Sequence, residues 1–301
     1  MASIAAEIID FGATLDFQLR ERYEPKLVAT KEELDLAFGK YTRPAPKSGW
    51  ISCGLNACDQ PHRYGFVIRL HDGSETHCGP DCGERHFGAK WAEVVATVKA
   101  TEEAAATRNS VAKLLGKRDA LVARGVDLAH RSRHLEELIF AANLFLSPFS
   151  AMRKALDQCA KSDGSIRAEV ENQATGIAAA GRPKTAQLRT VAIIEGIELL
   201  TTTFMRYSAV IDSSLPSLRA LNEESLRGAT QKELARRSNE GQQFEGSLDR
   251  AEQQLKRGAR LFEPVNLLKF ELLVEHQLRS ADITPRLRKA LDDFYALAPA
   301  G

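Results

Sequence analysis

The chain has 301 residues, 44% of them hydrophobic and 27% charged, with a formal net charge of +1. A chain of this length can bury a sizeable core and form one large or two smaller domains. Its nearly balanced charge gives no overall attraction to nucleic acid, and its many Ala, Leu, Glu, Arg and Gln residues favour a mainly helical fold.

Residues 1–49 are expected to form an N-terminal lead-in, and they contain no recognisable catalytic or binding motif. They lack the basic start and apolar segment of a secretory signal, so we expect a cytoplasmic protein with reduced cysteines. Thr30 and Glu33 form a capping-box pattern, which predicts a helix over residues 31–39. A proline-rich connector over residues 42–49 then leads into the most informative part of the chain.

Four of the five cysteines follow in two close pairs. Four residues separate Cys53 from Cys58, three separate Cys78 from Cys82, and 19 lie between the pairs. Both pairs enclose residues that favour tight turns, glycine with asparagine in the first and glycine with proline in the second. Four thiolates at two short spacings suit the tetrahedral shell of a structural Zn²⁺. We therefore expect these four cysteines to bind zinc.

The fourth ligand has alternatives. His77 adjoins Cys78, and His86 lies one helical turn after Cys82, so either imidazole is a candidate to replace Cys78. A disulfide framework would need an oxidising compartment, which nothing in the sequence indicates. Four unrelated buried cysteines are the remaining structural explanation.

The residues between and after the cysteine pairs predict a hairpin and a helix. Residues 64–70 are rich in aromatic and β-branched side chains, Asp72-Gly73 is a hairpin dipeptide, and residues 74–78 form a second short strand. After Cys82, apolar residues recur at helical spacing. These are Trp91, Val94, Val95 and Val98.

The order of knuckle, hairpin, second cysteine pair and helix resembles the treble-clef zinc fingers, over residues 50–98 only. The spacing departs from their commoner C-x2-C pairs, so the similarity is to an architecture rather than to a specific family. The resemblance implies that Cys53 and Cys58 form the knuckle and that Cys78 and Cys82 lie at the start of the helix. It implies no particular activity, because such fingers serve nucleic-acid binding, protein binding and nuclease chemistry.

The sequence contains no complete catalytic motif. A catalytic zinc keeps an open position, which four cysteines would close. His134 and Glu136 have the spacing of half a deaminase signature, but the chain has no P-C-x-x-C. The histidines near the hairpin, His71 and His77, do not form the motif of an HNH nuclease. A zinc-dependent nuclease is therefore only the third functional hypothesis.

Residues 99–301 predict a helical bundle with a break at 162–184. Long helices are expected over residues 91–126, over 133–161 with a kink at Pro148, and over 218–262 after a new segment begins at Pro216. Shorter helices are expected after Pro264 and after Thr284-Pro285. The apolar stretch 185–211 contains charged residues and therefore predicts a buried helix rather than a membrane span.

Two features of this helical part have ordinary explanations. Gly181-Arg182-Pro183 is similar to the core of an AT-hook, but it lacks a preceding arginine, and Pro183 serves equally as the first residue of a helix. Cys159 stands alone and predicts a small packing residue.

A heptad pattern runs from Leu234 to Phe262. Its seats are Leu234, Arg237, Gly241, Phe244, Leu248, Ala251, Leu255, Gly258 and Phe262. Several heptad positions hold residues that pack weakly in a coiled coil, which argues against a strong parallel coiled-coil dimer. Glycine and alanine seats favour close antiparallel packing within the chain, in an intramolecular bundle. A homodimer is the alternative arrangement.

Seven basic residues are candidates for nucleic-acid contact. They are Arg63, Arg69 and Arg85 in the finger and Lys113, Lys117, Arg124 and Arg131 along one face of the next helix. A basic stripe beside a zinc finger can bind phosphates, although charge runs are often solvated helix faces.

The leading hypothesis is a non-enzymatic zinc-finger binding or scaffold protein, with nucleic acid as one candidate partner. The alternative is a protein-interaction subunit of a larger complex, which should expose an apolar patch beside the finger or along residues 191–211.

Overall fold

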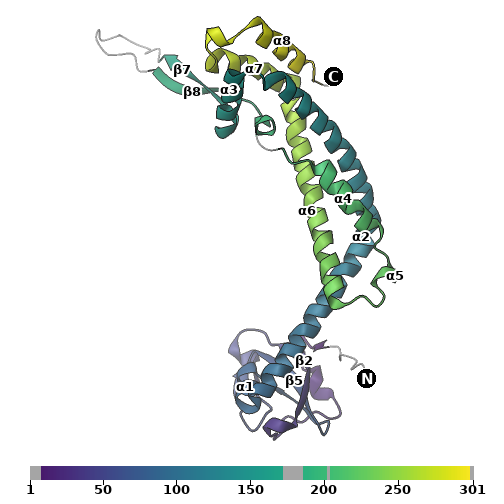
Figure 1. Cartoon of the computed structure of the whole chain (residues 1–301). Helices are drawn as coiled ribbons and strands as arrows, with labels where there is room; N and C mark the ends of the chain where they lie inside the picture. The colour runs from purple at the N-terminus through teal and green to yellow at the C-terminus, as the bar shows by residue number, and fades with distance from the viewer. Residues whose placement is uncertain (1–7, 172–185, 202–203, 299–301) are drawn as a thin grey trace, which may run out of the picture. The chain divides into compact units, whose positions relative to one another are not determined.

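The computed structural model describes residues 8–171, 186–201 and 204–298 and is mainly α-helical (Figure 1). The chain divides into two compact units. The N-terminal unit comprises Met1–Ala112 with Thr230–Ala235, and the helical unit comprises Lys113–Ala229 with Arg236–Gly301.

The N-terminal unit contains a four-stranded sheet in the order β1-β2-β5-β6. Its first strand pairs in parallel with the second, and the other pairs are antiparallel. The strands span Ile9–Asp10 (β1), Leu34–Thr42 (β2), Tyr64–Leu70 (β5) and Glu75–Cys78 (β6). A separate two-stranded sheet joins β3, Ile51–Ser52, to β4, Pro61–His62. The first helix, α1, spans Pro80–Phe87, and α2 begins at Ala89.

The predicted hairpin is confirmed as β5 and β6, but the helix predicted over residues 31–39 is wrong. The capping box forms on a single 3-10 turn, Lys31–Glu33, and strand β2 follows at once. Hydrogen bonding to β5 overrides the local helix signal, because β2 buries side chains in two different hydrophobic clusters. Leu34 and Ala37 join one cluster, and Phe38 and Tyr41 join the other.

The helical unit is built on long helices. The predicted long helix after residue 91 is confirmed as α2, Ala89–Leu146, and the chain breaks at Pro148 before α3, Ser150–Lys161. Helices α6, Gln231–Leu261, and α7, Pro264–Gln277, also follow the sequence pattern. The last helix, α8, spans Pro285–Tyr295 and is capped by Thr284, whose side chain accepts a hydrogen bond from the Leu287 amide at 3.2 Å.

The buried helix predicted over residues 185–211 is wrong. The described part of this stretch contains strand β8, Ala186–Ile193, paired antiparallel to β7, Ser165–Glu171, and then a 3-10 turn over Ile197–Leu200. Thr190, Val191 and Ile193 are β-branched and suit the strand, and Gly196 has a φ of +75° that interrupts regular structure. Residues 181–183, with the AT-hook-like sequence, lie outside the described residues.

Helices α4, Tyr207–Arg219, and α5, Glu223–Leu226, occupy the stretch before α6. Pro216 lies inside α4 rather than starting a new segment, and Gly228, with a φ of +80°, lies in the turn before α6. The long helix expected from residue 218 therefore begins only at Gln231.

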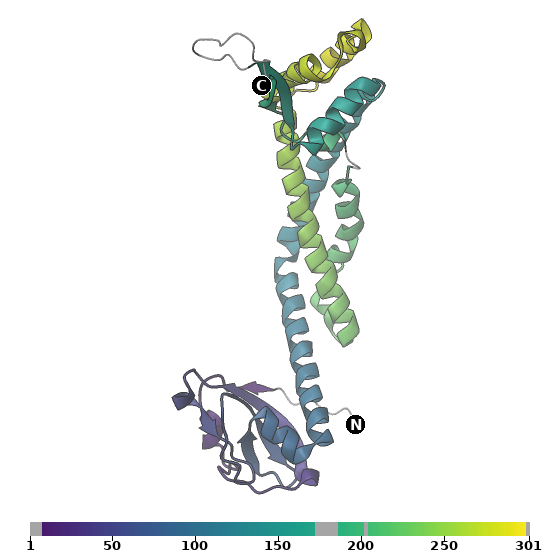
Figure 2. The same ribbon diagram turned by 90° about the vertical axis from the view of Figure 1, so that its left-hand side faces the viewer.

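Helices α2 and α6 pack side by side, as two views agree (Figures 1 and 2). A Cβ atom built on Gly241 would lie 2.4 Å from the Leu114 side chain, and one on Gly258 would lie 2.4 Å from Leu135. Both residue numbers rise along this contact, so the helices run parallel. The glycines at heptad positions of α6 thus permit close packing against α2 within the chain, as predicted. The predicted antiparallel direction of this packing is wrong.

Among the described residues, no helix combines the length and apolarity needed to cross a membrane.

Candidate metal centre

Three cysteine side chains converge in the N-terminal unit. The Sγ atoms of Cys53, Cys58 and Cys82 all lie within 4.8 Å of one another, and those of Cys58 and Cys82 are 3.3 Å apart. Cys53 directly follows β3, Cys58 lies in the loop before β4, and Cys82 lies in the first turn of α1. Because two sequence-distant segments bring three soft ligands together, the cluster could hold a metal ion.

The loop from Cys53 to Cys58 is shaped by local backbone chemistry. Asn56 and Ala57 adopt positive φ angles of 52° and 51°. The Asn56 side chain accepts a hydrogen bond from the Ala29 amide at 2.7 Å and donates one to the Ala29 carbonyl at 2.9 Å. A Cβ on Gly54 would lie 2.6 Å from the Thr76 Oγ1 atom, so glycine is required there. These constraints orient the thiols of Cys53 and Cys58 toward Cys82 in α1.

The predicted fourth cysteine lies beside this cluster but outside the three-thiol set. Cys78 ends β6 and is fully buried. Burial raises the pKa of its thiol well above the ordinary value, and nearby negative charge on Cys53, Cys82 and Cys58 raises that pKa further. Cys78 belongs to the same hydrophobic cluster as Cys53 and Cys82, against which Cys58 also packs.

His77 is committed to hydrogen bonds at both ring nitrogens. Its Nε2 atom lies 2.8 Å from the Ser52 carbonyl oxygen, which can only accept, so Nε2 carries the proton. Its Nδ1 atom therefore accepts from the Tyr23 hydroxyl at 2.8 Å. The ring is only 3% exposed and packs against Phe17 and Tyr41. In this arrangement neither nitrogen of His77 is available to a metal.

The other alternative ligand, His86, lies in the last turn of α1. Its Nδ1 atom is 3.3 Å from the Asn56 Nδ2 atom, so it accepts a hydrogen bond from the residue that shapes the cysteine loop. His86 thus lies close to the centre, with Nδ1 engaged.

The three thiols have different electrostatic environments. Burial raises the pKa of Cys53, and it also raises the pKa of Cys82, to about 12, together with a hydrogen bond to Cys58. Burial also acts to raise the pKa of Cys58. It is outweighed by hydrogen bonds from the Gln60 backbone and from the other two thiols and by the positive charge of Arg85, so the pKa of Cys58 is lowered. Cys58 therefore gains thiolate character most readily, while the buried thiols favour their neutral forms unless a cation compensates their charge.

Residues that the sequence reasoning did not single out hold this region together. Tyr23 donates to Nδ1 of His77, and the hydroxyl of Tyr41 is hydrogen-bonded to Nε2 of His62. Burial lowers the pKa of His62. No sequence motif marks these pairs, because their members come from separate strands and loops.

Most of the seven basic residues proposed for nucleic acid are already engaged within the chain. Four form ion pairs: Arg69 with Asp35 at 3.0 Å, Lys117 with Glu245 at 3.6 Å, Arg124 with Asp249 and Glu252 at 2.8 and 2.7 Å, and Arg131 with Asp127 at 3.3 Å. Arg63 donates to the Arg43 carbonyl at 3.0 Å and stacks on Tyr64. Arg85 acts electrostatically on Cys58, and Lys113 is exposed on α2.

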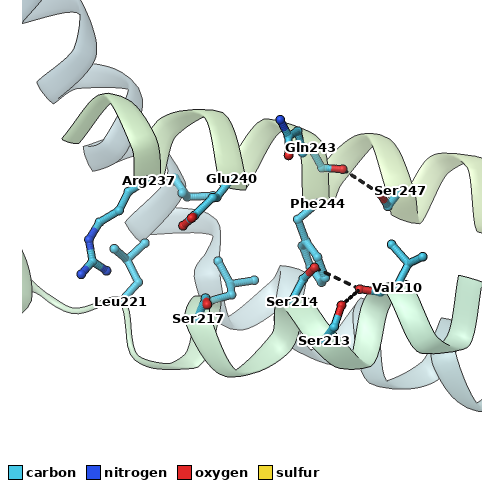
Figure 3. Close-up of a pocket in the computed structure, with 13 residues that line it drawn as sticks. Val210, Ser213, Ser214, Ser217, Leu221, Arg237, Glu240, Gln243, Phe244 and Ser247 are labelled. Carbon is cyan, nitrogen blue, oxygen red and sulfur yellow. Dashed lines mark hydrogen bonds between the residues drawn. The ribbon is translucent and has the colours of Figure 1, made fainter. Parts of the chain in front are cut away.

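Away from the cysteines, a pocket of about 250 Å³ lies between α4 and α6 (Figure 3). Its serine hydroxyls are used locally: Ser213 and Ser214 both donate to the Val210 carbonyl, and Ser247 donates to the Gln243 carbonyl. The described lining includes neither histidine nor cysteine. The one carboxylate of the described lining, Glu240, is ion-paired with Arg236 and makes no hydrogen bond to these serine hydroxyls, so the pocket shows no paired nucleophile and base.

The convergent thiols are therefore the feature of the described residues with the clearest chemical capacity, the binding of a thiophilic metal. No family model, curated protein or solved structure matches the chain, so this assignment depends on the geometry alone.

Proposed function

We propose that the N-terminal unit is a zinc-stabilised docking module of a non-enzymatic scaffold protein. The observation that carries the proposal is the convergence of Cys53, Cys58 and Cys82 within 4.8 Å. Cys78, buried next to them, is the proposed fourth ligand. The order of cysteine loop, β5–β6 hairpin and α1 supports a treble-clef-like finger.

A structural role follows from the donor set and its surroundings. Four thiolates close the tetrahedral shell of Zn²⁺ and leave no position for water or substrate. Cys53, Cys78 and Cys82 belong to one hydrophobic cluster with side chains from β2, β5, α1 and α2. In such a site the metal cross-links segments that are distant in sequence, and its binding free energy stabilises the fold.

A protein partner is favoured over nucleic acid. Phosphate binding needs cations that are free to replace counterions, whereas four of the seven candidate cations are ion-paired with carboxylates of this chain. Within the basic stripe of α2, Lys117 and Arg124 pair with carboxylates of α6, and Arg131 pairs with Asp127 of its own helix.

An exposed apolar side chain beside the cysteine loop supports a protein-docking surface. Val28 is 80% exposed, although its neighbours Leu27 and Ala29 are buried and hydrogen-bonded to Gly54 and Asn56 of the loop. An isolated exposed valine is ordinary, but this one is held on the rigid rim of the proposed finger.

The deciding experiment is metal analysis of the intact protein after reconstitution with Zn²⁺. One zinc per chain in the wild type and none in the Cys82→Ser variant is the expected result. A Cys159→Ser variant is the control, since Cys159 lies in the helical unit. A wild-type protein without stoichiometric zinc would overturn the proposal.

A second experiment separates the classes of partner. Binding to single- and double-stranded DNA and RNA is measured at several salt concentrations, for the wild type and for a variant with Lys113, Lys117, Arg124 and Arg131 changed to Ala. We expect no salt-sensitive binding that depends on these residues. Retention that falls with salt and is lost in the variant would instead support nucleic acid.

A further inference from the structure

The exposed side of α2 carries a second periodic stripe, separate from the one that faces α6. We call it the outer stripe; its six residues are all exposed and step by four and three alternately along the helix. They are Val126, His130, Arg133, Glu137, Phe140 and Leu144. The apolar members lie at the two ends, and the oppositely charged pair lies in the middle. Phe140 is 66%, Leu144 62% and Val126 46% exposed, which is unusual for large side chains at heptad spacing.

A shallow groove runs beside one end of the outer stripe. It lies between α2 and α4 and has a volume of about 420 Å³. Half of its lining is apolar, from Val126, Ala129, Leu215 and Pro216, and the other half is polar, from His130, Arg133, Asp212 and Arg219. Phe140 borders a second groove of about 450 Å³, which Phe204 also lines. The outer stripe thus offers exposed apolar side chains at one end and a depression of mixed apolar and polar lining at the other.

We propose that a second copy of this chain docks on the outer stripe, with the two α2 helices antiparallel. A two-fold axis beside residue 135 places Val126 against the partner's Leu144 and Arg133 against the partner's Glu137. The same operation places Phe140 over the partner's groove between α2 and α4. Every contact occurs twice, as closed two-fold symmetry requires.

Charge complementarity selects this direction. In a parallel pair in register, Arg133 would face the partner's Arg133 and Glu137 the partner's Glu137, and like charges at close range are unfavourable. The antiparallel pair replaces both repulsions with two Arg–Glu attractions. Arg133 already bonds Asp212 at 2.8 Å through one guanidinium nitrogen, but the guanidinium group has five N–H donors and can bridge two carboxylates.

The proposed contact has a plausible length for a helical dimer. The outer stripe spans 18 helical steps, or about 27 Å at 1.5 Å per residue. It lies wholly within the helical unit and uses none of the cysteines of the metal centre. It therefore does not depend on the proposed function, and either proposal can fail without the other.

The first test is the oligomeric state of the full-length protein, measured by sedimentation equilibrium over a range of concentrations. We expect a wild-type dimer and at least a hundred-fold weaker association for Phe140→Glu/Leu144→Glu, because each substitution places charge in both symmetric contacts. The matched control is Val265→Glu/Leu268→Glu on α7, two comparably exposed apolar residues outside the stripe, which should leave the dimer unchanged. A monomeric wild type, or equal dissociation of both variants, would overturn the proposal.

A charge exchange tests the contact between Arg133 and the partner's Glu137. Glu137→Arg should weaken the dimer about ten-fold or more, and Arg133→Glu/Glu137→Arg should restore it. Melting temperatures monitor the fold of each variant. A folded double variant that stays monomeric would contradict the proposed register.

Directed disulfide formation tests the direction. Val126→Cys and Leu144→Cys variants are oxidised with oxidised glutathione, separately and as a mixture. A covalent dimer that depends on the new thiols should form only in the mixture, because only unlike positions meet in the antiparallel pair. A covalent dimer from Val126→Cys alone would show a parallel pair and overturn the proposal.

Discussion

In the N-terminal unit, short strands and irregular loops surround two hydrophobic clusters, and the three convergent thiols pack in or against the larger one. In the helical unit, Leu114 and Leu135 of α2 pack against Gly241 and Gly258 of α6, and no comparable ligand cluster is found among its described residues. The contrast follows from the supply of apolar side chains. Long helices bury periodic surface against one another, whereas in the loop-rich N-terminal unit the proposed metal would add a cross-link to the packing.

The largest expected effect is the removal of metal from the N-terminal unit. Structural zinc contributes about 10 kcal/mol or more to the folding of small finger domains. A strong chelator, or Cys53→Ser, should therefore unfold the N-terminal unit and leave the helical unit folded. Hydrogen exchange read separately over residues 8–98 and 113–161 measures this difference.

The Cys159→Ala variant is the control for that comparison. It removes a buried thiol from the helical unit, and it should lower the stability of that unit modestly without changing the response to chelator. Equal protection of residues 8–98 with and without chelator would contradict a metal-dependent N-terminal unit.

A second effect, also confined to the N-terminal unit, is its response to acid. Burial lowers the pKa of His77 from 6.5 to about 4. The neutral ring is favoured in the folded state, so its contribution is fully present above pH 6.5 and is lost as the pH falls toward 4. This shift corresponds to about 3 kcal/mol. Denaturant unfolding of the N-terminal unit at pH 7 and pH 4.5, followed by the fluorescence of Trp50 and Trp91, which both lie in this unit, measures the loss.

His77→Gln should flatten this pH dependence, because glutamine keeps a donor for the Ser52 carbonyl and an acceptor for Tyr23 but does not titrate. Burial also lowers the pKa of His62, so a smaller acid response should remain. Acid release of metal affects both proteins alike, and the difference between them isolates His77. Identical curves for the two proteins would be inconsistent with a buried neutral His77.

Packing in the helical unit is tested by two pairs of glycines. Gly258→Ala and Gly241→Ala each place a methyl group 2.4 Å from a leucine of α2 and should cost about 1–3 kcal/mol through overpacking. Gly246→Ala and Gly116→Ala are the controls, since a Cβ there meets nothing within 4 Å, and alanine should stabilise these helices by up to about 1 kcal/mol. Thermal unfolding gives the sign. Stabilisation by all four substitutions would show that α2 and α6 do not pack closely.

The smallest expected effect concerns the start of α4. Glu136 accepts hydrogen bonds from the Ser208 amide at 3.1 Å and from its hydroxyl at 2.7 Å, and thereby caps the helix from a neighbouring one. Glu136→Ala should destabilise the helical unit by about 1 kcal/mol. A double-mutant cycle with Ser208→Ala should show coupling between the two residues. Additive losses would mean that the cap contributes nothing to stability.

The sequence by itself determined the features that neighbouring residues encode. The hairpin at Asp72-Gly73, the helix after Cys82 and the helix starts at Pro264 and Thr284 follow from turn residues and caps. The heptad pattern of residues 234–262 also predicted the buried face of α6 correctly, since Phe244, Leu248 and Ala251 are buried. Such signals act within a few residues and need no distant partner.

Only the tertiary structure decided the features that depend on distant partners. Residues 34–42 become a strand because β5 supplies hydrogen bonds, against a local helix signal. Lys117 and Arg124 meet carboxylates of α6 that lie more than a hundred positions away, so these two cations of the basic stripe are paired within the chain. The same non-local packing made α2 and α6 parallel and brought Cys82 to Cys53 and Cys58. Local pattern specifies elements, whereas their pairing depends on burial and charge that only the folded chain brings together.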